Sequence, residues 1–312
     1  MEHHRKWQIH RFALEKVIHL KANEKRVVDG RYLDMPAASF EGLRFAKQME
    51  LNTRGFELKF NLIPPGLVYF GRPPGRRGLN PRVHQSKPFW MMETELTADV
   101  LKAYRDAHGT PYEGELLIKS EEKDWRRVYA GQELSLIAAT HLIKKEAMQI
   151  ADWLAEDLPA GFKSKGSLEF RVPTTAEYVH AAHGNAETAW YWGDDISGAY
   201  EHEAMSLSGG HYVKRADANP FGLYDMYGNA PEVLLDNCFM DPRTWNDAWD
   251  FCGRLSEKGG RCNGGSIAIG GVTSEELIGG FGPGLRKVDP HWYIGCRYVL
   301  SPHRFVEMRG KE

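Results

Sequence analysis

The sequence predicts one large domain dominated by loops, preceded by an N-terminal extension. The chain has 312 residues, of which 42% are hydrophobic and 12% aromatic, and this composition supplies enough apolar material for a packed core. The 32 glycines and 16 prolines favour turns and loops over long regular elements. We therefore expect short helices and strands held together by irregular segments.

Charge and hydropathy narrow the possible functions. The formal net charge is −2 and the pI is near 6.7, which disfavours general binding of nucleic acid, because that function needs a strongly basic face. The sequence has no run of 18 apolar residues that would predict a membrane span. The first residues lack the apolar core of a secretory signal. We expect a cytoplasmic protein if the chain is complete from Met1, and a periplasmic one if a leader has been removed.

Residues 1–57 form the predicted extension. Apolar residues between Leu14 and Ile18 recur at helical spacing, and Ser39 is placed to cap a second helix that reaches Met49. One interpretation is a helical arm packed against the main domain. The other is a docking element for a partner.

Three helices are predicted in the main domain, which spans residues 58–312. The first runs from Ala98 to Ala107 after Thr97, the second covers residues 141–155, and the third begins after Thr174 or Thr175 and continues through Ala182. Thr174 and Glu177 have the spacing of a capping box. His180 and His183 share one face of this third helix, but two histidines are too few for a metal site, so we expect a surface or hydrogen-bonded pair.

The most informative segment is residues 221–232. Asp225 and Glu232 lie seven residues apart among aromatic and aliphatic side chains. A buried carboxylate without a partner is costly. We therefore predict that a positive or hydrogen-bonding group lies against each of these two carboxylates.

The same segment, Phe-Gly-Leu-Tyr-Asp-Met-Tyr-Gly-Asn-Ala-Pro-Glu, resembles the central signature of the formylglycine-generating-enzyme (sulfatase-modifying factor) family. Other segments resemble further family signatures in the same order along the chain: residues 60–66, 87–97, 171–178, 192–194, 263–266 and 295–299. The resemblance implies an α+β fold, an irregular and loop-rich variant of the C-type lectin fold.

The resemblance also implies a structural Ca²⁺ ion. In the family this signature coordinates calcium through two side chains and two backbone carbonyls. Here these are the side chains of Asp225 and Glu232 and the carbonyls of Gly228 and Ala230. Hard oxygen ligands are those that Ca²⁺ prefers. The alternative is that backbone N–H groups satisfy both carboxylates without a metal.

The chain departs from the family at the catalytic positions. The family's oxidase binds copper through two cysteines that follow the Gly-Gly-Ser motif, and these positions fall on Ile269 and Ser274 here. Neither side chain offers the soft thiolate that Cu(I) selects. No cysteine lies between Cys262 and Cys296 to replace them. We therefore expect no formylglycine-generating activity and no catalytic residues of that kind.

The remaining cysteines suggest one conditional crosslink. Cys238 and Cys252 flank the segment 239–251, which resembles an insertion. A disulfide between them is possible if the protein is exported, whereas both are expected to stay reduced in the cytoplasm.

Two functions remain open. The first is a non-catalytic regulatory component that binds another protein, as the resemblance includes bacterial fold members that act in type VI secretion signalling and variable proteins that use the fold as a binding scaffold. The second is an oxidase or other enzyme that modifies a peptide-derived substrate without the cysteine pair, as the resemblance also includes the pyoverdine-maturation oxidase. Glu232 or a histidine in a pocket would then be catalytic.

A glycine-rich segment between Ile267 and Asp289 is the predicted partner-binding surface. Large apolar side chains, among them Phe281 and Leu285, alternate there with glycines. Such a backbone does not form a stable helix and does not hide all of its apolar groups. The alternative is that these side chains fill the core under a long loop.

Overall fold

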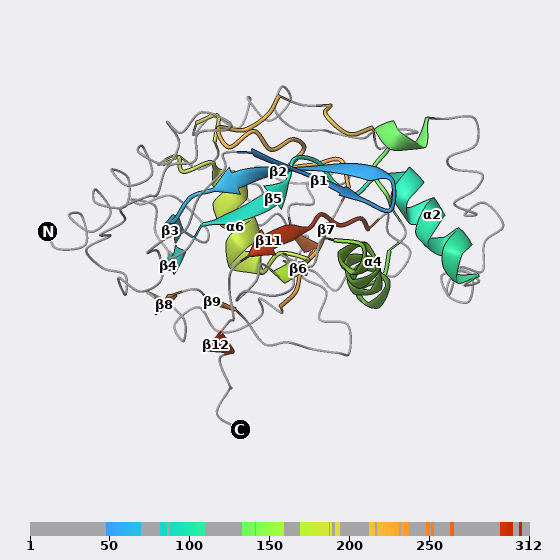
Figure 1. The fold of residues 1–312 in the computed structure, drawn as a ribbon. Helices are drawn as coiled ribbons and strands as arrows, with labels where there is room; N and C mark the ends of the chain where they lie inside the picture. Colours follow the sequence, from blue (N-terminus) through green and yellow to red (C-terminus); the bar gives the residue numbers. More distant parts are fainter. Residues whose placement is uncertain are drawn as a thin grey trace, which may run out of the picture.

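In this computed structural model the described residues are 48–69, 82–85, 88–109, 133–140, 142–158, 169–186, 188, 191–193, 212–215, 217–230, 232–236, 248–249, 251–252, 263–264, 294–301 and 306–307. They form a mixed α and β structure around a five-stranded antiparallel sheet with the order β1-β2-β5-β11-β6 (Figure 1). Its strands are β1 (Gln48–Thr53), β2 (Phe56–Ile63), β5 (Phe89–Met92), β6 (Glu169–Arg171) and β11 (Val299–Ser301). The predicted α+β class is therefore confirmed.

Smaller sheets complete the β structure. One contains β3 (Gly66–Tyr69), β4 (Arg82–Gln85) and β8 (Ala248–Trp249). A second pairs β7 (Glu232–Val233) with β10 (Asn263–Gly264), and a third pairs β9 (Phe251–Cys252) with β12 (Val306–Glu307). Their strands have only two to four residues, as expected for a loop-rich chain.

The main sheet is buried on both faces at β5. All four of its residues are buried; Trp90 and Met92 join one apolar core, and Phe89 and Met91 join another. Successive side chains of a strand point to opposite faces, so this alternation separates two cores. A continuous apolar run is the pattern of a strand that is covered on both sides.

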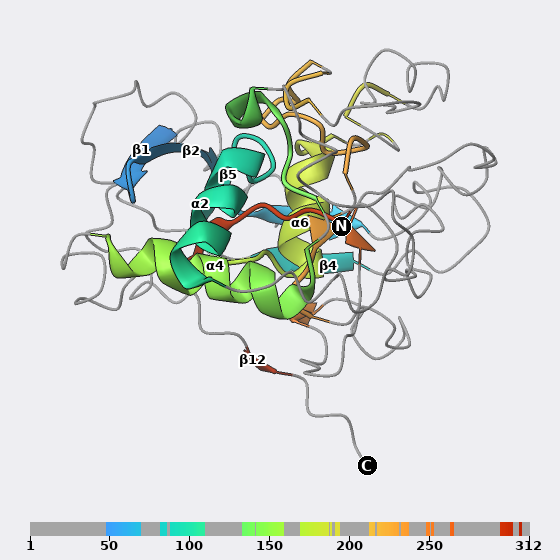
Figure 2. The same ribbon diagram turned by 90° about the vertical axis from the view of Figure 1, so that its right-hand side faces the viewer.

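Helices cover the two faces. The core of Trp90 and Met92 also contains side chains from α2 (Ala98–His108) and α4 (Lys144–Glu156), and the other core contains side chains from α6 (Thr175–His183). Figure 2 shows α2 and α4 side by side, and Figure 1 shows α6 apart from them. A short 3₁₀ helix, η3 (Leu134–Leu136), contacts α2.

The three helices predicted in the main domain are confirmed. In α6 the capping box is complete, because Glu177 N donates to Thr174 Oγ1 at 3.1 Å and Thr174 N donates to Glu177 Oε2 at 2.8 Å. Thr97 is the N-cap residue of α2, but its hydroxyl donates to Asp99 instead of accepting a cap bond.

One detail of the N-terminal prediction is wrong. Met49 lies in β1 and pairs with Phe60 of β2, so the predicted second helix does not reach it. The expected boundary between the extension and the main domain, at residues 57 and 58, falls inside β2. The pairing of β1 with β2 makes residues 48–57 part of the main sheet, and sequence periodicity did not reveal this pairing. Residues 1–47 lie outside the described part of the chain.

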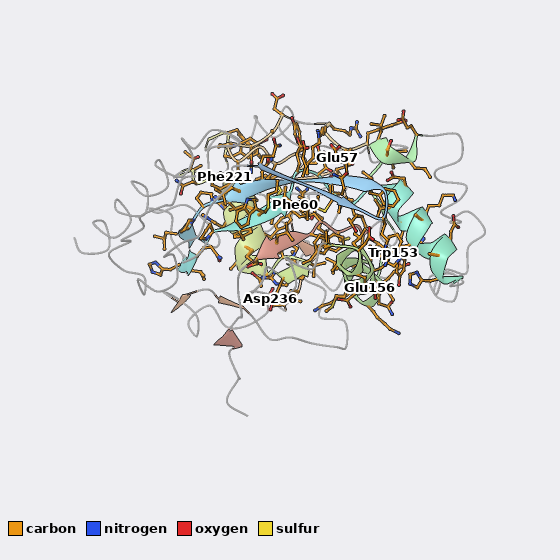
Figure 3. All side chains as sticks on the ribbon, viewed as in Figure 1. Glu57, Phe60, Trp153, Glu156, Phe221 and Asp236 are labelled. Carbon is orange, nitrogen blue, oxygen red and sulfur yellow. The ribbon has the colours of Figure 1, made fainter. Side chains whose placement is uncertain are left out.

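The tip of this hairpin holds the C-terminal end of α4. Arg54 donates from Nε to Trp153 O at 3.1 Å, and its backbone N–H donates to Asp157 Oδ2 at 2.6 Å. The guanidinium also lies 5.1 Å from the ring centre of Trp153 and bonds Glu156 at 2.9 Å. Figure 3 shows Trp153 and Glu156 together on α4, at one end of the molecule.

A buried carboxylate cluster as the candidate functional site

The segment 221–232 leads into β7 and brings Glu232 to the centre of the molecule. Glu232 is fully buried, and both of its oxygens accept hydrogen bonds from Arg297 Nε, at 2.8 and 2.9 Å. Arg297 Nη2 lies 2.7 Å from Glu232 Oε1. Arg297 comes just before β11 and is itself fully buried. The predicted partner of Glu232 is therefore a guanidinium supplied 65 residues further along the chain.

The second predicted carboxylate, Asp225, is held by backbone amides. Lys214 N donates to its Oδ2 at 2.6 Å and Arg215 N donates to its Oδ1 at 3.1 Å. Asp225 is buried and has a left-handed φ of 57°. The expectation that each carboxylate has a positive or hydrogen-bonding partner is thus confirmed for both residues.

A third carboxyl group, that of Glu95, joins this buried carboxylate cluster. Glu95 is fully buried between β5 and α2, and its Oε1 accepts a hydrogen bond from Asn229 Nδ2 at 3.1 Å. Its Oε2 has no hydrogen-bond donor and lies 3.9 Å from Arg297 Nη2. Burial raises the pKa of Glu95 well above its usual range, although Arg297 opposes this shift.

Tyr178 of α6 contacts the cluster from the core that contains Phe89 and Met91. Its hydroxyl donates to Met226 O at 3.0 Å and lies 3.5 Å from Glu232 Oε1. Burial raises the pKa of Tyr178 well above its ordinary value, so the phenol stays protonated. The cluster therefore links α6, the 221–232 segment, the end of β5 and the start of β11.

Strand pairing fixes the position of β7 within this arrangement. On one side β7 pairs with β10, and on the other Glu232 forms a bridge with Gly295, while Val233 N donates to Gly295 O at 3.0 Å. A Cβ atom on Gly295 would lie 2.6 Å from Ala139 O. Only glycine fits this close backbone approach.

The sequence did not predict the roles of Glu95 and Arg297. Both lie inside segments that resemble family signatures, but neither has a local neighbour that would reveal its partner. A signal was nevertheless present for Arg297, because an arginine in the apolar run Cys296–Leu300 indicates a buried and paired guanidinium.

Of the two α6 histidines, the prediction of a hydrogen-bonded residue is confirmed for His180, which is buried, whereas His183 Nε2 has no hydrogen-bond partner among the described residues. His180 Nε2 donates to Pro64 O at 2.7 Å, and burial lowers the pKa of both His180 and His183 to about 4. Both rings are therefore neutral at pH 7. Among the described residues, no three histidine, cysteine, aspartate or glutamate side chains are grouped so that they could hold a metal ion.

Several predicted positions cannot be placed. Ile269, Ser274, Phe281, Leu285 and Cys238 all lie outside the described residues. Of Cys252, only the backbone in β9 is described. Cys296, which precedes Arg297, is a buried free thiol.

Comparison with known proteins agrees with the fold and with the signatures that converge on this cluster. Residues 46–299 match the sulfatase-modifying factor enzyme 1-like domain family. The chain belongs to this family. No curated protein sequence matches this family member significantly.

Two solved structures are similar to this sulfatase-modifying factor-like protein. PvdO from Pseudomonas aeruginosa has 18% identity and a TM-score of 0.54, and the alignment covers 81% of this chain and 98% of PvdO. Variable protein 1 of Treponema denticola has 19% identity and a TM-score of 0.57, with 83% of this chain and all of that chain covered. At this identity the likeness shows a shared fold. No helix among the described residues is long and apolar enough to cross a membrane.

The predicted calcium ligands are engaged within the protein in this structure. The two oxygens of Asp225 accept hydrogen bonds from the backbone amides of Lys214 and Arg215, and both oxygens of Glu232 accept hydrogen bonds from Arg297 Nε. Carboxylate and carbonyl oxygens are nevertheless the ligands that Ca²⁺ selects. When bound, Ca²⁺ would join the Asp225 and Glu232 side chains to the carbonyls of Gly228 and Ala230.

Proposed function

We propose that this protein is a member of the sulfatase-modifying factor-like family that does not generate formylglycine and acts by binding another protein. The proposal is supported by the family resemblance, which places Ile269 and Ser274 at the positions of the copper-binding cysteines. An alkyl group cannot ligate copper, and a serine hydroxyl is neither a thiolate at pH 7 nor easily oxidised.

The geometry of the described residues supports a binding role over an enzyme that works without cysteines. Glu232 and His180 are the acid–base candidates for such an enzyme. Glu232 is fully buried against Arg297, and His180 is buried against Pro64 O. A general base must reach the proton that it abstracts, and both groups are instead engaged inside the protein.

A recognition surface in the segment between Ile267 and Asp289 is part of this proposal. The longer segment 265–293 begins directly after β10 and ends just before Gly295. Both β10 and Gly295 pair with β7, so β7 anchors the two ends of the segment. Loops presented by a fixed scaffold commonly carry binding function. We place the partner contact at Phe281 and Leu285.

A structural Ca²⁺ ion at Asp225, Gly228, Ala230 and Glu232 belongs to the proposal. It would stabilise the turn before β7 and so the anchoring of the recognition segment. Regulation of a bacterial secretion system of the type VI kind is the finer role that we propose, and it rests on the family resemblance alone.

An activity assay tests the non-catalytic part. With copper and a peptide containing Cys-x-Pro-x-Arg, the protein is expected to yield no formylglycine above a no-enzyme control. The aldehyde would be detected by mass spectrometry. Its formation above the control would overturn the proposal.

Substitution of the apolar side chains tests the binding part. Phe281→Glu and Leu285→Glu are expected to abolish partner binding and to leave the melting temperature unchanged, since an exposed residue tolerates a charge. A fall in melting temperature of several degrees would indicate that these side chains are buried, and the interface would then lie elsewhere. Leu101→Glu is the matched control, because Leu101 is fully buried and must cause such a fall.

A further inference from the structure

Residues 212–215 lie over the buried carboxylate cluster and contact it through a few specific bonds. The backbone amides of Lys214 and Arg215 donate to Asp225, as described above. Tyr212 O accepts a hydrogen bond from Asn229 Nδ2 at 3.1 Å, and the same amide group donates to Glu95. Asn229 therefore connects this surface segment directly to a buried carboxyl group.

The side chain of Lys214 makes a second connection. Its Nζ lies 5.0 Å from the ring centre of Tyr224 and 3.1 Å from Glu93 Oε1. Tyr224 O, in turn, accepts a hydrogen bond from Arg297 Nη2 at 3.1 Å. Tyr224 therefore contacts both the Lys214 side chain and the buried guanidinium of Arg297.

Burial changes abruptly across this contact. Tyr212 is 43% exposed, and Lys214 and Arg215 are also exposed, whereas Glu95, Glu232 and Arg297 are fully buried. Segments with few buried apolar contacts open at low free energy. Within the described chain, residues 212–215 therefore form a weakly packed cover between solvent and the cluster.

Backbone strain is concentrated at the same place. Among the described residues, five non-glycine residues have positive φ, and three of them are Lys214, Asp225 and Asn229. A lysine is disfavoured in this region, while aspartate and asparagine tolerate it better. Strained residues gathered at one contact are characteristic of switch regions.

We propose that residues 212–215 form a latch that opens as a unit and, in opening, admits solvent and cations to the buried Glu95–Glu232–Arg297 cluster. This inference goes beyond the proposed binding function and does not depend on calcium being bound. Asp225 and Asn229 hold the latch closed through its backbone, and Glu93 and Tyr224 hold it through Lys214. Its first two residues are also tied to the segment after η3, because Val213 N donates to Leu136 O at 2.9 Å and Tyr212 forms a β-bridge with Ile137.

Hydrogen exchange of the unmodified protein, measured by NMR in the presence of a chelator, is the first test. The Lys214 and Arg215 amides are expected to exchange at least 100-fold faster than the Leu235 amide, which donates to Pro173 O inside the core. Their exchange should be insensitive to low concentrations of denaturant, as local opening exposes little surface. Exchange only through global unfolding would overturn the proposal.

Two variants test the connection to the cluster. Asn229→Gly removes the tether while keeping a residue suited to the left-handed backbone, and it should speed exchange of the latch amides about tenfold. Glu93→Gln removes the charge that the Lys214 ammonium contacts, and it should speed exchange of the latch amides about twofold. Asn185→Gly is the matched control, since Asn185 also has a φ of 62° but lies after α6.

The side-chain Nε–H of Arg297 reports access to the cluster. Because it is hydrogen-bonded to Glu232, its exchange should accelerate in parallel with the latch amides in both variants and remain unchanged in Asn185→Gly. Faster latch exchange without faster Arg297 Nε–H exchange would overturn the claim that the latch controls access.

Discussion

At the scale of residues, one arginine, Arg297, compensates the buried carboxylates at the centre of this protein. Arg297 is the one buried guanidinium that the structure places among Glu95, Asp225 and Glu232. Breaking a buried ion pair by removing one partner leaves an uncompensated charge, which is more costly than removing both partners. The stability of the cluster therefore depends on the pair Arg297 and Glu232.

We predict that Arg297→Met lowers the free energy of unfolding by about 3–5 kcal/mol. The double variant Arg297→Met, Glu232→Gln should lose less, because no unpaired charge remains. Urea unfolding of both variants measures this difference. Lys102→Met, which removes an exposed ion pair with Asp106, is the control and should change the free energy of unfolding by less than about 1 kcal/mol. A double variant as unstable as the single one would contradict the ion-pair argument.

At the scale of elements, α6 is fixed to its neighbours by a neutral histidine, His180. His180 donates to Pro64 O, and a Cβ atom on Gly66 of β3 would lie 2.4 Å from the His180 ring. The ring therefore packs against the backbone between β2 and β3 without space for a larger residue. Burial lowers the pKa of His180 to about 4 from an ordinary value of 6.5.

This shift predicts loss of stability in acid. Between pH 6.5 and 4 the unfolded chain binds a proton at His180 that the folded protein does not, so the free energy of unfolding falls as pH decreases through this window. The full contribution of His180 is about 3 kcal/mol, present above pH 6.5. Urea unfolding of wild type and His180→Gln at several pH values would measure it, and the variant should show the smaller decrease. Equal slopes would show that His180 does not titrate in this way.

The β1–β2 hairpin and α4 form a second contact between elements. Thr53 Oγ1 donates to Leu154 O at 2.6 Å, and Arg54 donates to Trp153 O, so the hairpin tip satisfies carbonyls that a helix end leaves unpaired. We predict that Thr53→Val lowers the free energy of unfolding by about 1–2 kcal/mol and speeds amide exchange in the last turn of α4. Thr94→Val is the control, because Thr94 Oγ1 bonds only the adjacent Glu95 carbonyl. Unchanged exchange in α4 would contradict the capping role.

For the whole molecule, strand β5 makes the two cores depend on each other, because its alternate side chains belong to one core and then to the other. The carboxylate cluster joins them through Tyr178 and Arg297, and the predicted calcium ligands belong to this junction. A ligand that binds only the folded state raises its stability. A cation at Asp225 and Glu232 would therefore stabilise the entire fold and not only the turn that it occupies.

We expect thermal melts in excess calcium to show a midpoint several degrees above that in chelator, since about 1 kcal/mol shifts a domain of this size by about 2–4 °C. Magnesium should produce less effect, because it requires stricter octahedral geometry. Asp225→Asn should abolish the calcium response, and Asp99→Asn, a half-buried carboxylate at the start of α2, should retain it. Identical midpoints in calcium and chelator would remove the metal from the proposal.

The family resemblance implied the α+β class, and the sequence by itself determined the three helices of the main domain and the requirement that Asp225 and Glu232 have partners. These features are local, because helical spacing, the Thr174–Glu177 capping box and a carboxylate in an apolar segment are visible within a few residues. Only the tertiary structure decided that Arg297 and Glu95 meet Glu232 and Asn229, that Met49 lies in a strand, and that residues 212–215 close over the cluster. These contacts join residues far apart in the chain, and the free energy that selects them comes from burial, which no short segment encodes alone.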